Sequence, residues 1–172
     1  MTTQFNLSLT SSVPRRQALK AVALAASGLL LPPFVNNAHA LSGWQACTIV
    51  GAAFKKLDLP YADNATDISK SADCSLLTQW CYKQASIQIP RNSLAQFNAC
   101  RMCVRRDTAG ALLFFRTVSK TVVSHVAIAV GDGSMISANS ISSTGKPRVV
   151  LVQNWANNFN WGPKFVTAAV PF

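Results

Sequence analysis

The chain changes its hydrophobic period once, near residue 107, and this change constrains the fold more than any other feature. Before it, apolar residues recur at three- and four-residue steps, which predict helices over 42–57, over 73–85 and from 93. After it, short runs of β-branched and aromatic residues with alternating patterning predict strands over 111–118, 121–130, 134–139, 148–153 and 164–170. Helices followed by an antiparallel sheet predict the α+β class. In the first helix we expect Trp44, Cys47 and Phe54 on the buried stripe.

The first forty residues have the pattern of an export signal. Adjacent Arg15 and Arg16 precede an apolar run over 21–31, which is too short to span a bilayer, and Ala38-His39-Ala40 is a small-x-small cleavage signature. We interpret 1–40 as a signal peptide that resembles the twin-arginine type, with a retained membrane anchor as the alternative. The sequence therefore predicts a bacterial protein in the periplasm or secreted, with no stable membrane span after cleavage.

Residues 41–172 then form a single domain of ordinary size, which we expect to be a monomer. Loss of the two arginines and Lys20 lowers the net charge from +10 to +7. All six acids are aspartates, which argues against a catalytic carboxylate pair as the basis of function. The net positive charge suits an anionic partner such as a wall polymer. We find no nucleic-acid motif and expect no nucleic-acid partner.

Five cysteines lie in the mature part, and the odd number leaves one thiol over. Cys74 is the candidate for a reactive thiol. An exported protein can keep disulfides, so Cys47, Cys81, Cys100 and Cys103 are expected to form up to two bridges of open connectivity. A Cys100–Cys103 redox pair is the alternative, although the strand of a thioredoxin-type unit is missing in front of it.

Asp73-Cys74-Ser75 begins the second helical pattern, and His125 opens a strand. A helix N-terminus and a protonated imidazole both lower a thiol pKa, and the N–H groups of a first turn, such as that of Ser75, suit an oxyanion hole. His125 is the sole histidine after residue 40, so any imidazole base in the mature chain is this one. The alternative is a core histidine and an inert cysteine.

A third group usually orients the imidazole. A three-residue turn after Val130 places His125 opposite Asn139, with Ser137 as its diagonal neighbour, so either side chain is a candidate. The small residues at 127 and 129 are expected to leave that strand face open.

Several motifs, in this order, resemble the NlpC-type cell-wall peptidases, a papain-like family of cysteine peptidases. They are Asp73-Cys74-Ser75-Leu76-Leu77, Ile89-Pro90-Arg91-Asn92-Ser93, Gly110-Ala111-Leu112-Leu113-Phe114-Phe115, Ser124-His125-Val126-Ala127-Ile128, Gly131-Asp132-Gly133, and Trp161-Gly162 with Phe165. The resemblance implies a papain-like fold, with N-terminal helices packed on the antiparallel sheet. It also implies cleavage of amide bonds in peptidoglycan stem peptides, commonly between D-glutamate and a diamino acid.

By the same resemblance Cys74 is the nucleophile, His125 the base, and Ser137 stands at the family's third position, with Asn139 as the alternate. Tyr61 resembles a tyrosine near the oxyanion site. No metal or cofactor is implied. Leu76 and Ala111 depart from the family pattern, which leaves two alternatives: a catalytically degenerate envelope-binding module, or an acyltransferase or hydrolase with a different acyl substrate.

Overall fold

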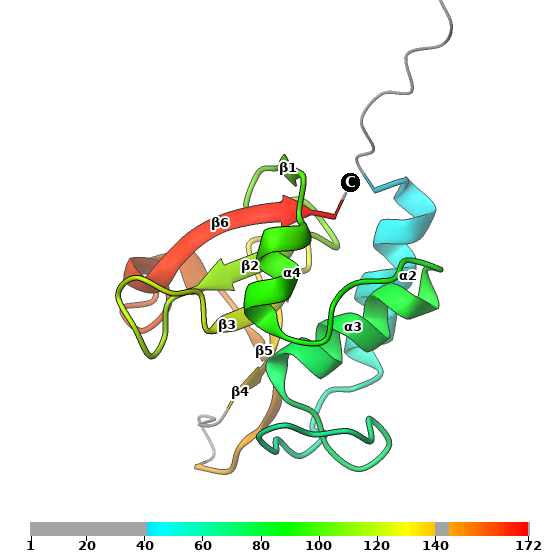
Figure 1. The fold of residues 1–172 in the computed structure, drawn as a ribbon, viewed down its shortest axis with the longest axis horizontal. Helices are drawn as coiled ribbons and strands as arrows, with labels where there is room; N and C mark the ends of the chain where they lie inside the picture. Colours follow the sequence, from blue (N-terminus) through cyan, green and yellow to red (C-terminus); the bar gives the residue numbers. More distant parts are fainter. Residues whose placement is uncertain (1–40, 140–144, 172) are drawn as a thin grey trace, which may run out of the picture. The chain divides into compact units, whose positions relative to one another are not determined.

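The computed structural model describes residues 41–139 and 145–171, and the predicted signal peptide over 1–40 lies outside them. In this part of the chain the helices come first: α2 (Gly43–Phe54), α3 (Cys74–Gln84) and α4 (Ser93–Ala99). The strands follow as β1 (Met102–Cys103), β2 (Leu112–Phe115), β3 (His125–Ala129), β4 (Met135–Asn139), β5 (Arg148–Val152) and β6 (Phe165–Val170) (Figure 1). The predicted α+β class is confirmed.

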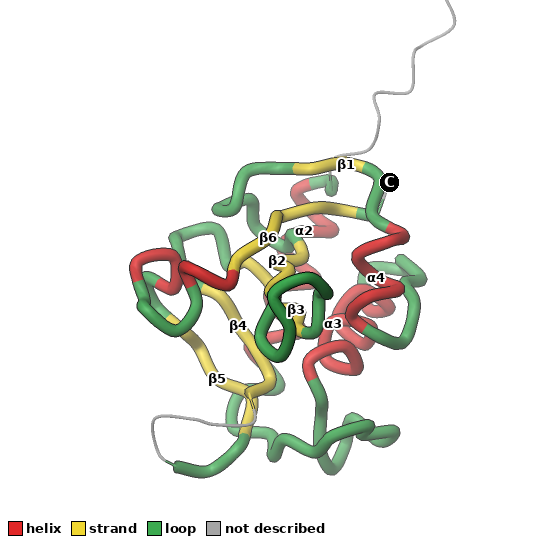
Figure 2. Tube along the Cα trace, turned by 60° about the vertical axis from the view of Figure 1, so that its left-hand side comes forward, coloured by secondary structure: helices red, strands yellow, loops and turns green. Residues whose placement is uncertain are grey.

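The strands form one antiparallel sheet in the order β1-β6-β2-β3-β4-β5. The sequence patterns predicted all of them except β1, whose two residues are too few to show a period. Two 3-10 helices, η1 (Trp155–Asn157) and η2 (Gly162–Lys164), connect β5 to β6 and were also not predicted. Figure 2 shows these short helices across the sheet from α3 and α4.

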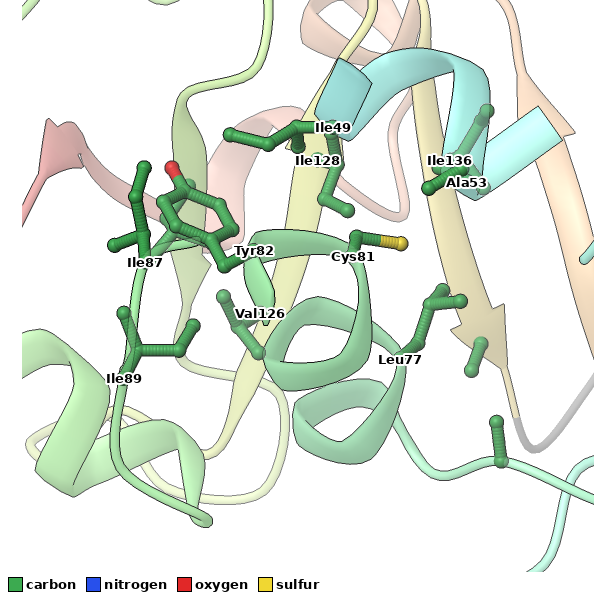
Figure 3. Packing of buried hydrophobic residues seen from close by; sticks show 14 of the residues in the cluster. Ile49, Ala53, Leu77, Cys81, Tyr82, Ile87, Ile89, Val126, Ile128 and Ile136 are labelled. Atoms are coloured by element: carbon green, nitrogen blue, oxygen red, sulfur yellow. The ribbon is translucent and has the colours of Figure 1, made fainter. Parts of the chain in front are cut away.

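The helices cover one face of the sheet: α2 packs on α3, and both contact β3. The core between them is mostly aliphatic, with Tyr82, Phe114 and Cys81 also buried in it, and its aliphatic members include Ile49, Ala53, Leu77, Val126, Ile128 and Ile136 (Figure 3). A fully buried aliphatic side chain of this kind stabilises a fold by about 1.5–3 kcal/mol. This layer therefore holds α3, whose first residue is Cys74, firmly against the strand that begins with His125.

The opposite face of the sheet is also covered, which contradicts the expectation of an open face beside His125. Ala127 and Ala129 are fully buried in a second cluster with Phe115 and Trp155. The small alanines leave room that these large rings fill, so the missing side-chain volume on β3 is supplied by β2 and η1.

The expected buried stripe of α2 is wrong. Trp44 is 64% exposed, Phe54 is 41% exposed and Cys47 is exposed, whereas Ile49 and Ala53 are buried. The side of α2 that is buried carries Ile49, Ala52 and Ala53, because α2 packs against α3 and β3. The positions of the large apolar residues therefore did not predict which face of α2 is buried.

The register of the β3–β4 hairpin agrees with the prediction. Val130 donates its backbone N–H to Ser134 at 3.0 Å, and Ile128 pairs with Ile136. Gly131 and Gly133 supply the positive φ angles of the turn, which other residues adopt at a cost. This register directs Ser137 toward the same side as His125.

The expected disulfides are not formed: all five cysteines, which lie in the described residues, are free. Cys81 is buried inside α3's packing face, while Cys47 lies on the exposed side of α2. Cys100 follows α4 and Cys103 lies in β1, with Thr167 Oγ1 3.7 Å from its sulfur. Within the described ranges, no helix is long and apolar enough to cross a membrane.

Candidate active site

A cavity of about 600 Å³ lies between the beginning of α3 and the beginning of β3, and both Cys74 and His125 line it. Its other lining residues are Tyr61, Asp63, Thr117, Val118, Ser124, Asn139, Asn160, Trp161 and Lys164. A smaller cavity of about 310 Å³ beside the turn over 131–133 contains none of the predicted site residues. The fold therefore brings the cysteine and the histidine of the sequence motifs to one solvent-accessible hollow.

Cys74 is the first residue of α3, and the cap before it fixes its position. The Asp73 carboxylate accepts a hydrogen bond from the Leu76 backbone N–H at 2.8 Å, as an N-cap does. Arg91 donates to both oxygens of this carboxylate and, at 2.9 Å, to the Ser75 hydroxyl. Burial on its own raises the Asp73 pKa, but these donors outweigh it and hold the pKa below its ordinary value.

The Cys74 thiol is neutral at physiological pH, in contrast to the lowered pKa expected from a helix N-terminus. Burial is the largest influence and raises its pKa to about 11, and the Asp73 carboxylate acts in the same direction. The backbone N–H groups of Val126, Ser75 and Cys74 itself favour the thiolate but do not compensate. The contact with Val126 also sets the sulfur beside the residue that follows His125.

Both candidates for the group that orients the imidazole belong to one hydrogen-bonded chain, in which Ser137 contacts His125 and Asn139 contacts Ser137. His125 Nε2 lies 2.7 Å from Ser137 Oγ, and Ser137 Oγ donates to Asn139 Oδ1 at 2.7 Å. A hydroxyl carries a single hydrogen, and here it points to Asn139. Nε2 must therefore be the protonated nitrogen, which leaves Nδ1 bare and able to accept a proton.

His125 is also neutral in this setting. Burial lowers its pKa from 6.5 to about 4, and only 9% of its surface is exposed. Aromatic rings enclose it: the ring centroids of His125 and Trp161 are 5.1 Å apart, and those of His125 and Phe115 are 6.1 Å apart. A neutral thiol and an unprotonated ring nitrogen in the lining of one cavity suit general-base chemistry, in which the proton moves as sulfur attacks.

Tyr61 and Ser75, the predicted oxyanion or substrate residues, lie in different surroundings. Tyr61 lines the cavity and donates its hydroxyl hydrogen to Asp63. Burial, then the hydrogen bond to Asp63, raises the Tyr61 pKa far above its ordinary value, so the hydroxyl stays protonated. The Ser75 side chain points away, donating to Asp73 at 3.0 Å, and only its backbone N–H acts on Cys74.

Residues that sequence reasoning gave no role complete the site. Arg91 was quoted within a motif, yet only its folded position shows that it holds Asp73. Trp161 and Lys164 come from the β5–β6 connection, far from the motif cysteine in sequence. Sequence periodicity did not place Trp161 and Lys164 at the site, because a 3-10 turn has no hydrophobic period. Among the described residues no group of three His, Cys, Asp or Glu is placed to hold a metal ion.

Curated relatives from Bacillus subtilis and Escherichia coli are among those that share sequence with the chain. It is 35% identical over 94 residues to the bifunctional muramidase/DL-endopeptidase CwlT of Bacillus subtilis, covering 54% of this chain and 29% of that protein. It is 26% identical over 152 residues to the probable endopeptidase YafL of Escherichia coli, covering 84% and 61%. The chain thus spans less than two thirds of either relative.

Solved structures share the fold and confirm its papain-like α+β arrangement. A NLP/P60 family lipoprotein-like protein of Staphylococcus aureus matches with a TM-score of 0.65 at 25% identity, over 80% of this chain and 44% of that one. The NlpC/p60 domain of the peptidoglycan hydrolase SagA matches with a TM-score of 0.56 at 30% identity, over 73% and 97%. RipD of Mycobacterium tuberculosis, described as a non-catalytic NlpC/p60 domain protein, shares the fold at 18% identity and a TM-score of 0.53, over 73% and 95%.

The family model described as NlpC/P60 family matches residues 59–165, more than half of the chain. The match begins before Tyr61 and ends at Phe165, so it contains the whole cavity lining. The motif order, the fold and the sequence matches agree, and the chain belongs to the NlpC/P60 family.

Proposed function

We propose that the chain is an exported cysteine endopeptidase that hydrolyses amide bonds in peptidoglycan stem peptides. The observation that carries the proposal is one cavity holding the Cys74 thiol and a His125 ring whose Nε2 is fixed by Ser137. Family membership and the endopeptidase relatives support the substrate class. The basic balance of the chain fits an anionic wall polymer.

The reaction uses the neutral pair directly. Cys74 Sγ attacks the amide carbonyl carbon while His125 Nδ1 takes the thiol proton. The C–N bond then breaks, His125 returns this proton to the leaving amine, and the acyl group remains on sulfur as a thioester. Water, deprotonated by the same nitrogen, hydrolyses the thioester, and the proton passes back to the departing thiolate.

The oxyanion of the tetrahedral intermediate needs donors near Cys74. The backbone N–H groups of Cys74 and Ser75 serve this purpose, because they belong to the first turn of α3 and the side-chain cap reaches only Leu76. Tyr61 can add a third donor if its hydroxyl turns away from Asp63. The Tyr61→Phe variant measures this contribution as a fall in kcat.

Digestion of purified sacculi tests the proposal. We expect wild-type protein to release soluble stem-peptide fragments, and Cys74→Ala and His125→Ala to release none above background. Cys47→Ala is the matched control, because Cys47 is exposed on α2 and does not line the cavity. No release by the wild type, or equal release by Cys74→Ala, contradicts the proposal.

Export is a separate part of the proposal and rests on residues 1–40, which lie outside the described residues. We expect processing after Ala40, so that the mature chain begins at Leu41. Mass spectrometry of the N-terminal peptide from the periplasm or medium of a producing strain measures this. Recovery of the chain with residues 1–40 attached to membranes indicates a retained anchor instead.

A non-catalytic wall-binding module is the second candidate, and the high pKa of the Cys74 thiol favours it. This candidate predicts that wild type and Cys74→Ala sediment equally with sacculi and release nothing. The endopeptidase predicts release that depends on Cys74. Both predict slow alkylation of Cys74 at neutral pH, so fragment release and not thiol reactivity separates them.

A further inference from the structure

Two neighbouring segments beside the cavity expose large apolar side chains to water. Val118 in the β2–β3 loop is 89% exposed and Phe159 in the β5–β6 connection is 83% exposed, more than any other large hydrophobic residue among those described. Val122 in the same loop is 46% exposed. One exposed apolar side chain is ordinary on a protein surface, but three on adjoining segments indicate a contact with an apolar medium.

The backbone holds the two segments together at one end of the sheet. The N–H of Arg116, where the loop begins, donates to the carbonyl of Lys164, where the connection ends, at 2.9 Å. Val118 and Asn160, which follows Phe159, line the same cavity. Both segments lie at the left-hand side of Figure 1. The exposed apolar side chains therefore belong to one surface that borders the cavity.

The same surface is positively charged. The two segments, 116–124 and 158–164, contain no acidic residue. Their cationic residues are all exposed and form no ion pair with any of the described residues: Arg116, Lys120 and Lys164. Asp63 is the single acid in the cavity lining, and it comes from the loop before α3. Protruding apolar side chains are thus combined with a net positive charge.

This combination indicates which anionic partner fits. A soluble anionic polymer would pair with the cations, but it offers nothing to Val118 and Phe159, whose burial is favourable only where they leave water. A bilayer of anionic phospholipid satisfies both kinds of group, because its phosphates attract the cations and its acyl boundary accepts the apolar side chains. The charge and the exposed apolar surface together therefore match a lipid surface.

We infer that residues 116–124 and 158–164 form a docking surface for an anionic phospholipid bilayer. Val118 and Phe159 enter the headgroup region and the cationic residues contact lipid phosphates, so the contact is peripheral and spans nothing. Because Val118 also lines the cavity, a docked molecule has its cavity beside the bilayer surface. This inference adds a partner to the proposed endopeptidase and does not depend on its catalysis.

Vesicle flotation tests the docking surface. The experiment uses the mature chain 41–172, so that the apolar run over 21–31 adds no lipid binding of its own, and residues 37–172 form one compact unit. One set of vesicles is phosphatidylcholine alone, and the other is phosphatidylcholine and phosphatidylglycerol in equal parts. We expect wild type to bind the anionic vesicles at least about tenfold more tightly. The preference should shrink toward one at high salt, because ions screen exposed charges.

Variants assign the binding to the two segments. Phe159→Ser should weaken binding to the anionic vesicles by about tenfold, because a phenyl ring no longer enters the lipid. Lys120→Gln should weaken it by about fivefold and reduce the preference over neutral vesicles. Trp44→Ser and Lys83→Gln are the matched controls, because both residues are exposed on helices and neither lines the cavity. Both controls, and Cys74→Ala, should bind like wild type.

The outcomes separate this inference from the proposed function. No flotation with the anionic vesicles overturns the docking surface and leaves the endopeptidase intact, since release from sacculi is measured separately. Vesicle binding that neither Phe159→Ser nor Lys120→Gln weakens places the contact elsewhere and also overturns it. Sedimentation with purified sacculi that both variants weaken, without flotation, identifies a wall polymer as the partner instead.

Discussion

Replacing His125 with glutamine should change how the stability of the protein depends on pH. Burial holds the folded-state pKa of His125 at about 4, below its ordinary value of 6.5. Between these two pH values the unfolded chain binds a proton that the folded chain does not. The stability that the neutral imidazole provides is therefore complete above pH 6.5 and is lost as the pH falls toward 4.

The size of the effect follows from the two pKa values. Each unit of difference corresponds to about 1.4 kcal/mol, so the gap between 6.5 and about 4 is worth about 3 kcal/mol. With 9% of its surface exposed, His125 has little water to screen this effect. His125→Gln keeps a polar side chain near Ser137 but does not titrate, so it removes this part of the pH dependence alone.

Urea unfolding of both purified proteins at pH 7, 6, 5 and 4 measures the effect. Between pH 7 and pH 4 the wild type should lose about 3 kcal/mol more unfolding free energy than His125→Gln. Aspartates such as Asp73 add their own acid sensitivity, but they are common to both proteins and cancel in the difference. Parallel curves would refute the lowered pKa that burial is expected to give His125.

Three further changes have expected outcomes. Ser137→Ala removes the acceptor of the imidazole N–H, and kcat should fall by about tenfold with KM little changed in steady-state assays. Arg91→Met leaves the buried Asp73 carboxylate without its cation and should lower the unfolding free energy by about 2–3 kcal/mol in urea, an effect that adding Asp73→Asn should partly reverse. Gly162→Ala should lower Tm, because its new Cβ would lie 2.4 Å from a backbone oxygen of η1, whereas Gly51→Ala, in open space within α2, should gain about 0.5–1 kcal/mol of stability.

The sequence predicted the elements that carry a regular period and the residues that motifs mark. Cys74 and His125 were found because a helix start and a strand start each have a local signature. The hairpin register was predictable for the same reason, since a glycine-rich turn of fixed length determines which residues of β3 and β4 face each other.

Features that depend on packing were not predictable. The face of α2 was assigned wrongly because hydrophobicity alone does not say which side of the helix packs against α3 and β3. The neutral state of the Cys74 thiol was also not predicted. The effect of the helix N-terminus on the thiol pKa can be read locally in the sequence, but burial outweighs it and depends on the whole fold. Trp161 and Lys164 reach the cavity through a connection without regular structure.

The hairpin turn after β3 gives the site an unusual sensitivity to insertions. Ser137 and Asn139 are two residues apart on β4, so they face one side together, and one extra residue in the turn would rotate both away. The imidazole would lose its hydrogen-bonded support in a single step, although its aromatic neighbours Trp161 and Phe115 would be unchanged.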